Sequence, residues 1–488
     1  MRLMASPAYR RPVLWWAGTR VILLLWALSA VPSISHGAVV GDVSLYSHWA
    51  QYMQGQGNFP SYDPQWQYPP GAALIMLFPQ IFVNLGFSYI VVFYLFALAA
   101  DTAVFRLLLG QADRIAREAD APAHMSGLWA WIGGGFAVGP LILMRYDVIV
   151  TALAVGGLLA TVNATARRSA DTARRRTWAL RGALIGLGAI IKVWPAVLLA
   201  GLPDGRDGRR ALAWAAGAGI VVSGVLCAIM PGGLSFITGQ YGRGIEVESV
   251  LATPFSVAAW FGYDAQTVHE FGAFQISGTG VDLVGSCSLL LTVIGLGFVV
   301  WWRLRRFNHA SWSPALMYDV ALTVVLIMVV TDRVLSPQYL IWLMGLAALC
   351  LAENGPGRRA TVMATPAKLV MACVLVTQIE FPILFGEVMG HGVWGTSLVA
   401  ARNTTLVVAT VLAIKALWRA STKAPARPAA DGTVPSGAGA AVGAQAGAGP
   451  DGAAPTATPA DGTGPAGAGG ISADGIPVVA GAPVEPTR

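Results

Sequence analysis

An acid and a tyrosine, Asp42 and Tyr46, follow the first apolar run of the chain and open a polar, aromatic stretch that ends near Tyr68. A carboxylate at the boundary between water and lipid costs solvation free energy, so it usually has a task. In that place it is suited to accept the proton of a hydroxyl group while the hydroxyl oxygen forms a new bond. The alternative is that Asp42 caps a helix that begins near Val43.

A lysine, Lys192, stands inside another apolar run, between Ile191 and Val193. Burying its ammonium group costs several kcal/mol unless the group is paired or extends to the membrane surface. The sequence has no acidic residue within one helical turn of it. A ligand phosphate would be a natural partner, because lysine binds phosphate as a point charge. The alternative is that the side chain extends to the membrane surface.

More charged residues lie between apolar runs. Arg145 and Asp147 stand where one run ends and the next begins, either as a topological anchor in which they neutralise each other or as ligand contacts. In the segment 243–249, Arg243 is suited to a phosphate or a sugar, and Glu246 or Glu248 to acceptor hydroxyl groups. The alternative for that segment is a solvated ion-pair face worth under about 1 kcal/mol.

Arg333 belongs to a further charged cluster that ends at an expected helix start with Gln338 and Tyr339. One acid and several cations on one face of a membrane predict an anionic lipid donor and a hydroxyl acceptor. The topology derived below places four of these charges on that face, with Lys192 reaching inward: Asp42, Arg145, Arg243 and Arg333.

The composition predicts the elements that must position these residues. Of 488 residues, 55% are hydrophobic and 12% are charged, and the mean hydropathy is +0.60. Soluble domains carry about twice that charged fraction, so we expect an all-α polytopic membrane protein. The net charge of +7 comes from basic residues in short loops, which the positive-inside bias explains without nucleic acid. The four cysteines fall in apolar spans and indicate packing rather than a disulfide or a metal site.

Runs of about 20 apolar residues are long enough to cross a bilayer. Two stretches are different: 70–86 is short, and 182–201 carries Lys192 and Pro195 near its middle. We expect both to be re-entrant, because irregular backbone at membrane depth is tolerated only beside a cavity or protein; about twelve full spans is the alternative. The expected spans are 13–31, 87–109, 128–144, 147–166, 211–229, 281–302, 313–331, 337–351, 362–385 and 394–417.

The distribution of lysine and arginine predicts that both termini face the cytoplasm. The first helix is expected to remain uncleaved, because no small-residue cleavage site follows it. Two long loops, 32–69 and 230–280, then lie outside and are long enough to form interfacial helices. Residues 1–420 form the membrane domain, and the Ala/Gly/Pro-rich tail 421–488 is expected to be disordered because it cannot bury a core.

An ordered set of short motifs resembles the bacterial polyprenyl-phosphate-mannose-dependent glycosyltransferases of family 87, which have the membrane GT-C fold. The resemblance covers roughly residues 13–420. The motifs are Asp42-x-x-x-Tyr46, Tyr68-Pro69-Pro70, Arg145-Tyr146-Asp147, Lys192-Val193-Trp194-Pro195, Arg243 to Ser249, and Ser336-Pro337-Gln338-Tyr339.

The resemblance implies a GT-C-like bundle of about 10–12 transmembrane helices. It also implies an inverting transfer of a hexose, mannose in this family, from a polyprenyl-phosphate donor to a glycolipid or polysaccharide acceptor outside the cytoplasmic membrane. Asp42 would be the base, and Lys192 and Arg243, with Arg145 and Arg333, would contact phosphate. A second acid of the first loop, Asp63, lies in a Tyr-Asp-Pro turn and is not expected to be catalytic. No Asp-x-Asp pair is present, so we expect a reaction without a metal or other cofactor.

Three other interpretations remain open at this point. The same fold could transfer another lipid-linked sugar such as arabinofuranose. A transporter or flippase of a lipid-linked sugar would also use broken helices and a buried lysine; inverted repeats would favour it, and none is evident. A catalytically silent subunit of an envelope-synthesis complex is the third.

Overall fold

The computed structural model describes residues 7–28, 36–161, 169–239, 242–306, 312–355 and 358–422. Within them the protein is an all-α polytopic membrane protein in which six helices are long and apolar enough to cross a bilayer. These are α4 (Tyr89–Ala119), α9 (Arg206–Ile229), α12 (Val281–Arg306), α13 (Pro314–Thr331), α15 (Ala364–Gln378, continued by the irregular turn η5, Ile379–Ile383) and α17 (Val393–Thr422).

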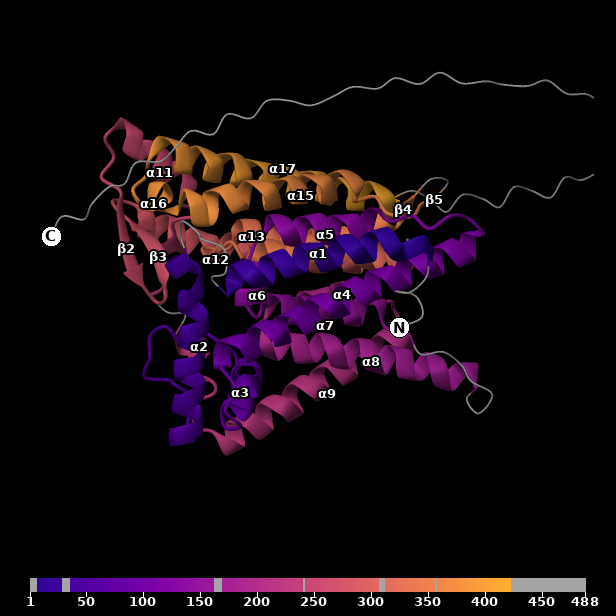
Figure 1. The fold of residues 1–488 in the computed structure, drawn as a ribbon. Coiled ribbons are helices and arrows are strands. Elements are labelled where there is room, and N and C mark those ends of the chain that lie inside the picture. Colours follow the sequence, from indigo (N-terminus) through magenta and orange to yellow (C-terminus); the bar gives the residue numbers. More distant parts are fainter. Residues whose placement is uncertain are drawn as a thin grey trace, which may run out of the picture. The chain divides into compact units, whose positions relative to one another are not determined.

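Shorter apolar helices complete the bundle: α1 (Arg10–Ala27), α5 (Ser126–Ala137), α6 (Leu141–Met144), α7 (Asp147–Leu159) and α14 (Tyr339–Ala352). The described part of each of the ten expected spans lies mainly on a helix, with 128–144 divided between α5 and α6 and 362–385 among α15, η5 and the start of α16 (Phe385–Met389). Residues 29–31 and 162–166 of the expected spans lie outside the described residues. In Figure 1 the helices α1, α4, α5, α15 and α17 lie side by side along one axis. The most hydrophobic segment of α13 is 78% buried and that of α9 is 11% buried, so α13 forms the core while α9 faces lipid.

Arg20 on α1 explains how a charged residue is accommodated in an apolar helix. Its guanidinium group donates to both carboxylate oxygens of Asp101 on α4, at 2.8 and 3.0 Å, and to the carbonyl oxygens of Trp131 and Ile132 on α5. Gly135 leaves the space for it, because a Cβ atom there would overlap the guanidinium nitrogen Nη2. The pair thus joins three helices.

The stretch 182–201 turns back at Lys192. Helix α8 (Ala170–Ile191) ends there, and the 3₁₀ segment η2 (Trp194–Gly201) follows. Gly182 of α8 faces the carbonyl oxygen of Ala211 on α9, and Gly186 faces that of Ala215, so α8 and α9 run in the same direction at close range. Because the two helices are parallel, η2 must carry the chain back from Lys192, as the re-entrant prediction requires. This close backbone approach needs glycine, as in other membrane helix pairs.

The stretch 70–86 forms one short helix, α3 (Ala72–Val83), beside α2. It begins at the turn of α8, where the Gly71 N–H donates to the Ile190 carbonyl oxygen at 2.9 Å.

The two long loops fold differently. The first forms helix α2 (His36–Gln56), which crosses the direction of the long helices at one end of the bundle (Figure 1). For 230–280 the expectation of interfacial helices was wrong in the main, because a three-stranded antiparallel sheet forms its centre. The strands are β1 (Ile245–Glu246), β2 (Gln266–Glu270) and β3 (Ala273–Ser277) in the order β1-β3-β2, with the short helices α10 (Ser235–Thr238), α11 (Thr253–Ala258) and η3 (Ala259–Phe261) around them.

The hairpin between β2 and β3 explains the sheet. Its two central residues, Phe271 and Gly272, both have positive φ, +52° and +70°. This is the two-residue turn whose twist matches that of paired strands. The remaining elements are η1 (Pro7–Tyr9), α16 (Phe385–Met389) and the strand pair β4 (Asn354–Gly355) and β5 (Arg358–Arg359). The predicted tail lies outside the described residues except for its first two.

Candidate functional site

The site is centred on the break between α6 and α7. Met144 ends α6, Arg145 is extended with φ −120° and ψ 140°, and Asp147 begins α7. Because the backbone at Arg145 is extended, the side chains of Arg145, Tyr146 and Asp147 do not share one helical face and reach different neighbours. Arg145 pairs with Asp42 of α2 and Asp147 pairs with Lys192, so the direct ion pair of each residue is with another helix or turn.

Asp42 lies within helix α2 rather than at its start. The helix begins at His36, so the capping interpretation was wrong. The carboxylate of Asp42 contacts the guanidinium group of Arg145, and the two side chains are 31% and 12% exposed. Asp42 is therefore a held carboxylate that retains access to solvent.

Lys192 is held by a carboxylate and surrounded by aromatic rings. Its Nζ donates to Asp147 Oδ1 at 2.6 Å, and the indole N–H of Trp342 donates to the same oxygen at 2.6 Å. Nζ also lies 4.9–5.3 Å from the ring centres of Tyr146, Tyr339 and Trp342. A partner for Lys192 thus comes from the chain itself, 45 residues earlier, and not from a ligand alone.

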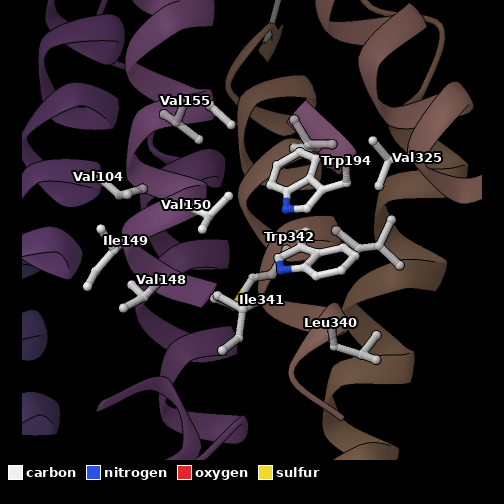
Figure 2. Packing of buried hydrophobic residues seen from close by; sticks show 14 of the residues in the cluster. Val104, Val148, Ile149, Val150, Val155, Trp194, Val325, Leu340, Ile341 and Trp342 are labelled. Carbon is white, nitrogen blue, oxygen red and sulfur yellow. The ribbon is translucent and has the colours of Figure 1, made fainter. Parts of the chain in front are cut away.

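The wall behind this ammonium group is tightly packed. Trp194, two residues after Lys192, stacks on Trp342 with ring centres 5.3 Å apart, and Val150, Val325 and Leu340 lie around the two indoles (Figure 2). A rigid wall fixes the turn at Lys192, since closely packed side chains have few alternative positions.

Two predicted tyrosines, Tyr46 and Tyr68, lie against Tyr146. The ring of Tyr146 lies 5.5 Å from that of Tyr46 and 5.6 Å from that of Tyr68. Tyr46 is buried and Tyr68 is half-buried. Asp63 accepts hydrogen bonds from the Trp49 indole and the Gln65 N–H, both at 2.8 Å, so it holds the loop as expected.

Arg333 fixes the segment that carries Arg243 and Glu246. It donates to the carbonyl oxygen of Arg243 at 2.8 Å, and its own carbonyl accepts from the Glu246 N–H at 2.9 Å. Ser336 donates to Glu246 Oε1 at 2.6 Å, while Oε2 is buried without a hydrogen-bond partner. Burial raises the pKa of the Glu246 carboxyl, and Ser336 and Arg243 oppose that shift.

The other predicted residues divide between this place and its margin. Tyr339 faces Lys192, and Gln338 is half-buried where α14 begins. Glu248 faces a different partner, Arg402 of α17, with 3.8 Å between Oε1 and Nη1. The sequence reasoning missed Arg402 and its second partner Glu380. The available signal was an arginine inside an otherwise apolar span, since a charge there usually has a function.

An apolar groove of 410 Å³ lies against the turn at Lys192. Residues of α8, η2 and α9 line it, among them Ile190, Ala196 and Gly219. Within the described part of the chain, no group of three or more His, Cys, Asp or Glu side chains is placed to hold a metal ion. The arrangement joins a solvent-accessible carboxylate, several cations and a groove suited to an apolar chain.

Comparison with protein families gives one match. Residues 66–331, more than half of the 488, match the model of glycosyltransferase family 87. The matched range includes Arg145, Asp147, Lys192 and Arg243 but not Asp42 or Arg333. Searches of curated proteins and of solved structures gave no significant match. The match and the membrane-helical fold together show that the chain belongs to glycosyltransferase family 87.

Proposed function

We propose that the protein transfers a hexose, mannose in the first instance, from a polyprenyl-phosphate donor to a hydroxyl group of a lipid or glycan acceptor, on the outer face of the cytoplasmic membrane. The observation that carries the proposal is the adjacency of two ion pairs, Asp42–Arg145 and Asp147–Lys192, on neighbouring residues of one turn. It supports the proposal, because a carboxylate suited to accept a proton lies beside cations suited to bind a phosphate.

The cations provide the donor phosphate site. Lys192 would exchange part of its contact with Asp147 for a phosphate oxygen, and its aromatic surroundings keep the ammonium group in place. Arg243 and Arg145 each have a buried Nε–H without a hydrogen-bond partner. Unpaired buried donors are costly, so a ligand that supplies acceptor oxygens would bind there favourably.

The groove along α8, η2 and α9 suits the donor's lipid tail. Ile190 lines it and stands two residues before Lys192 in the chain. Its lining is almost entirely apolar and it faces the lipid side of α9, whose most hydrophobic segment is only 11% buried. An isoprenoid chain can enter from the bilayer without crossing polar protein.

The reaction is a single displacement. The acceptor oxygen attacks the anomeric carbon, and the bond from that carbon to the phosphate oxygen breaks. The hydroxyl proton passes to the Asp42 carboxylate, and the electron pair leaves with polyprenyl phosphate, which gains a negative charge. Lys192 and Arg243 stabilise that charge in a site of low dielectric, where such contacts are worth most. Attack from the opposite side inverts the anomeric centre. No step requires a metal.

Asp42→Asn tests the base. The amide preserves the size of the side chain but cannot accept the proton, so we expect kcat to fall about 10²- to 10⁴-fold. The measurement is transfer of radiolabelled mannose from polyprenyl-phosphate-mannose to membrane lipids, with donor binding measured in parallel. Asp264→Asn is the matched control, since Asp264 is an exposed acid of the 230–280 segment that contacts Gln266.

Equal transfer by wild type and the Asp42 variant would remove Asp42 from the mechanism. If the wild type transfers no sugar but moves the intact donor between leaflets of a vesicle, the protein is a transporter and the proposal fails. Transfer from a lipid-linked arabinofuranose, and none from the mannose donor, would change the sugar and keep the mechanism.

A further inference from the structure

A second charged cluster lies behind the site, fully enclosed. Arg402 of α17 is 0% exposed, and its Nη1 donates to the Glu380 carboxylate at 2.7 Å. Its Nη2 donates to the carbonyl oxygen of Glu248 at 2.6 Å, and its Nε to the side-chain oxygen of Asn403 at 3.1 Å. The guanidinium group thus joins α17, η5 and the segment 243–249.

The contact with Glu248 fixes a backbone position. The side-chain amide of Asn403 donates to the same carbonyl oxygen at 3.0 Å and to Thr253 Oγ1 at 2.8 Å. Two neighbouring side chains of one helix therefore hold one peptide group.

The opposite end of the segment has its own support. Arg333 binds the Arg243 carbonyl oxygen, and the Glu246 N–H donates to the Arg333 carbonyl oxygen. The strand between the two supports, β1, is only two residues long and pairs with β3 alone. So short a pairing is weak by itself, and the supports decide where Arg243 and Glu246 lie.

We propose that Arg402 is a positioning residue for sugar transfer: it clamps the backbone at Glu248 and thereby holds Arg243 and Glu246 toward the donor. The proposal rests on the proposed function for its kinetic consequence, but the clamp itself is a structural property that can be measured without turnover. Arg402 lies outside the residues that match the family model.

The charges of the cluster assign different roles to its two acids. Two buried carboxylates facing one guanidinium group would leave an uncompensated negative charge, so one of them carries a proton. Glu380 lies within 2.7 Å of Arg402, whereas Glu248 Oε1 is 3.8 Å away. Burial, and next the neighbouring Glu380, hold the pKa of Glu248 well above its ordinary value. Glu248, the acid farther from the guanidinium group, is therefore the neutral member of the cluster.

Arg402→Lys tests the clamp. Lysine retains the charge for Glu380 but lacks the planar fork that reaches the Glu248 carbonyl at the same time. We expect amide hydrogen exchange of 243–249 to rise at least about tenfold, with peptides of α13 and α14 unchanged. The variant should also raise the KM for the donor several-fold more than it lowers kcat. Arg419→Lys, at the far end of α17 and exposed, is the matched control and should change neither quantity.

The two acids provide the second test. Glu248→Gln substitutes one neutral hydrogen-bonding group for another, so exchange of 243–249 and the donor KM should stay within about twofold of wild type. Glu380→Gln changes the acid that lies 2.7 Å from the Arg402 guanidinium group and should reproduce the Arg402→Lys effects. Equal effects of the two substitutions would overturn the charge assignment.

Unchanged exchange of 243–249 in Arg402→Lys would overturn the clamp, whatever the enzyme's activity. A wild-type protein that transfers no sugar while Arg402→Lys loosens 243–249 would instead refute the proposed function and leave the clamp standing. Loss of folding in Arg402→Lys, judged by its thermal transition, is checked against Glu248→Gln and Glu380→Gln, which keep the guanidinium group.

Discussion

Two ion pairs inside the membrane domain have the same parts but differ in what they leave free. In each pair a cation meets an aspartate that also accepts an indole N–H: Arg20 with Asp101, and Lys192 with Asp147. All five N–H groups of Arg20 have an acceptor, two on Asp101 and one each on Thr19, Trp131 and Ile132.

The Lys192 ammonium group makes one hydrogen bond among the described residues, to Asp147, and otherwise faces aromatic rings. It is also more accessible, with 14% of its side chain exposed against 2% for Arg20. A buried cation whose donors are all used belongs to the framework, whereas one that keeps donors free can still take a ligand. Burial of charge alone does not distinguish the two.

The largest effects are expected from removing each cation and then neutralising its acid. Arg20→Gln or Lys192→Gln leaves a buried aspartate unpaired and should reduce the free energy of unfolding by about 3–5 kcal/mol. Adding Asp101→Asn or Asp147→Asn should restore much of that stability. The double variant Arg20→Gln/Asp101→Asn should transfer sugar normally. The double variant Lys192→Gln/Asp147→Asn should bind donor about 10- to 100-fold more weakly, since a hydrogen bond to a charged group contributes about 1.5–3 kcal/mol.

Thermal unfolding and donor binding measure the two quantities separately. Normal donor affinity in Lys192→Gln/Asp147→Asn would make the second pair part of the framework like the first. Lost transfer in a stable Arg20→Gln/Asp101→Asn protein would give the first pair a role in the reaction.

The features that depend on local composition, the spans and the turn at Lys192, could be predicted from the sequence. Apolar runs determine the spans, because about 20 apolar residues suffice to cross the bilayer. The turn at Lys192 followed from a charge and a proline inside one such run. In the sheet of 230–280, the addition of β1 did not follow, because β1 has two residues and its pairing with β3 bridges some thirty residues. The β2–β3 hairpin is local and was missed.

The candidate residues were found one by one, but not their partners. Lys192 and Asp147 are 45 residues apart, and Arg402 and Glu248 are 154 apart. Which acid meets which cation depends on how helices pack, and no local spacing encodes that. The capping interpretation of Asp42 failed because α2 begins six residues earlier, at His36, directly after Ser35, a residue type that favours helix starts.

A smaller effect is expected from crowding the framework pair. In Gly135→Ala the new Cβ would overlap the Arg20 guanidinium group, which cannot move without breaking its hydrogen bonds. We expect a loss of about 1–3 kcal/mol in unfolding free energy, as for other overpacked sites. Gly133→Ala on the same helix is the control, because nothing lies within 4 Å of its added Cβ. Sugar transfer per folded molecule should be unchanged in both variants. Reduced turnover in Gly135→Ala would show that the Arg20–Asp101 pair affects the reaction at Lys192–Asp147.

The smallest effects should come from the two indoles, and they give the most direct comparison. Trp16→Phe and Trp342→Phe each remove one hydrogen bond to the aspartate, 2.8 Å and 2.6 Å long in the wild type. Each should cost about 1 kcal/mol of stability. With its indole gone, Asp101 keeps the fixed fork of Arg20 and donor binding should not change. Asp147 would instead rely on Lys192 alone and compete more strongly with the donor phosphate for it, so donor affinity should fall a few-fold in Trp342→Phe only. Equal donor affinity in both variants would mean that Asp147 does not compete with the donor for Lys192.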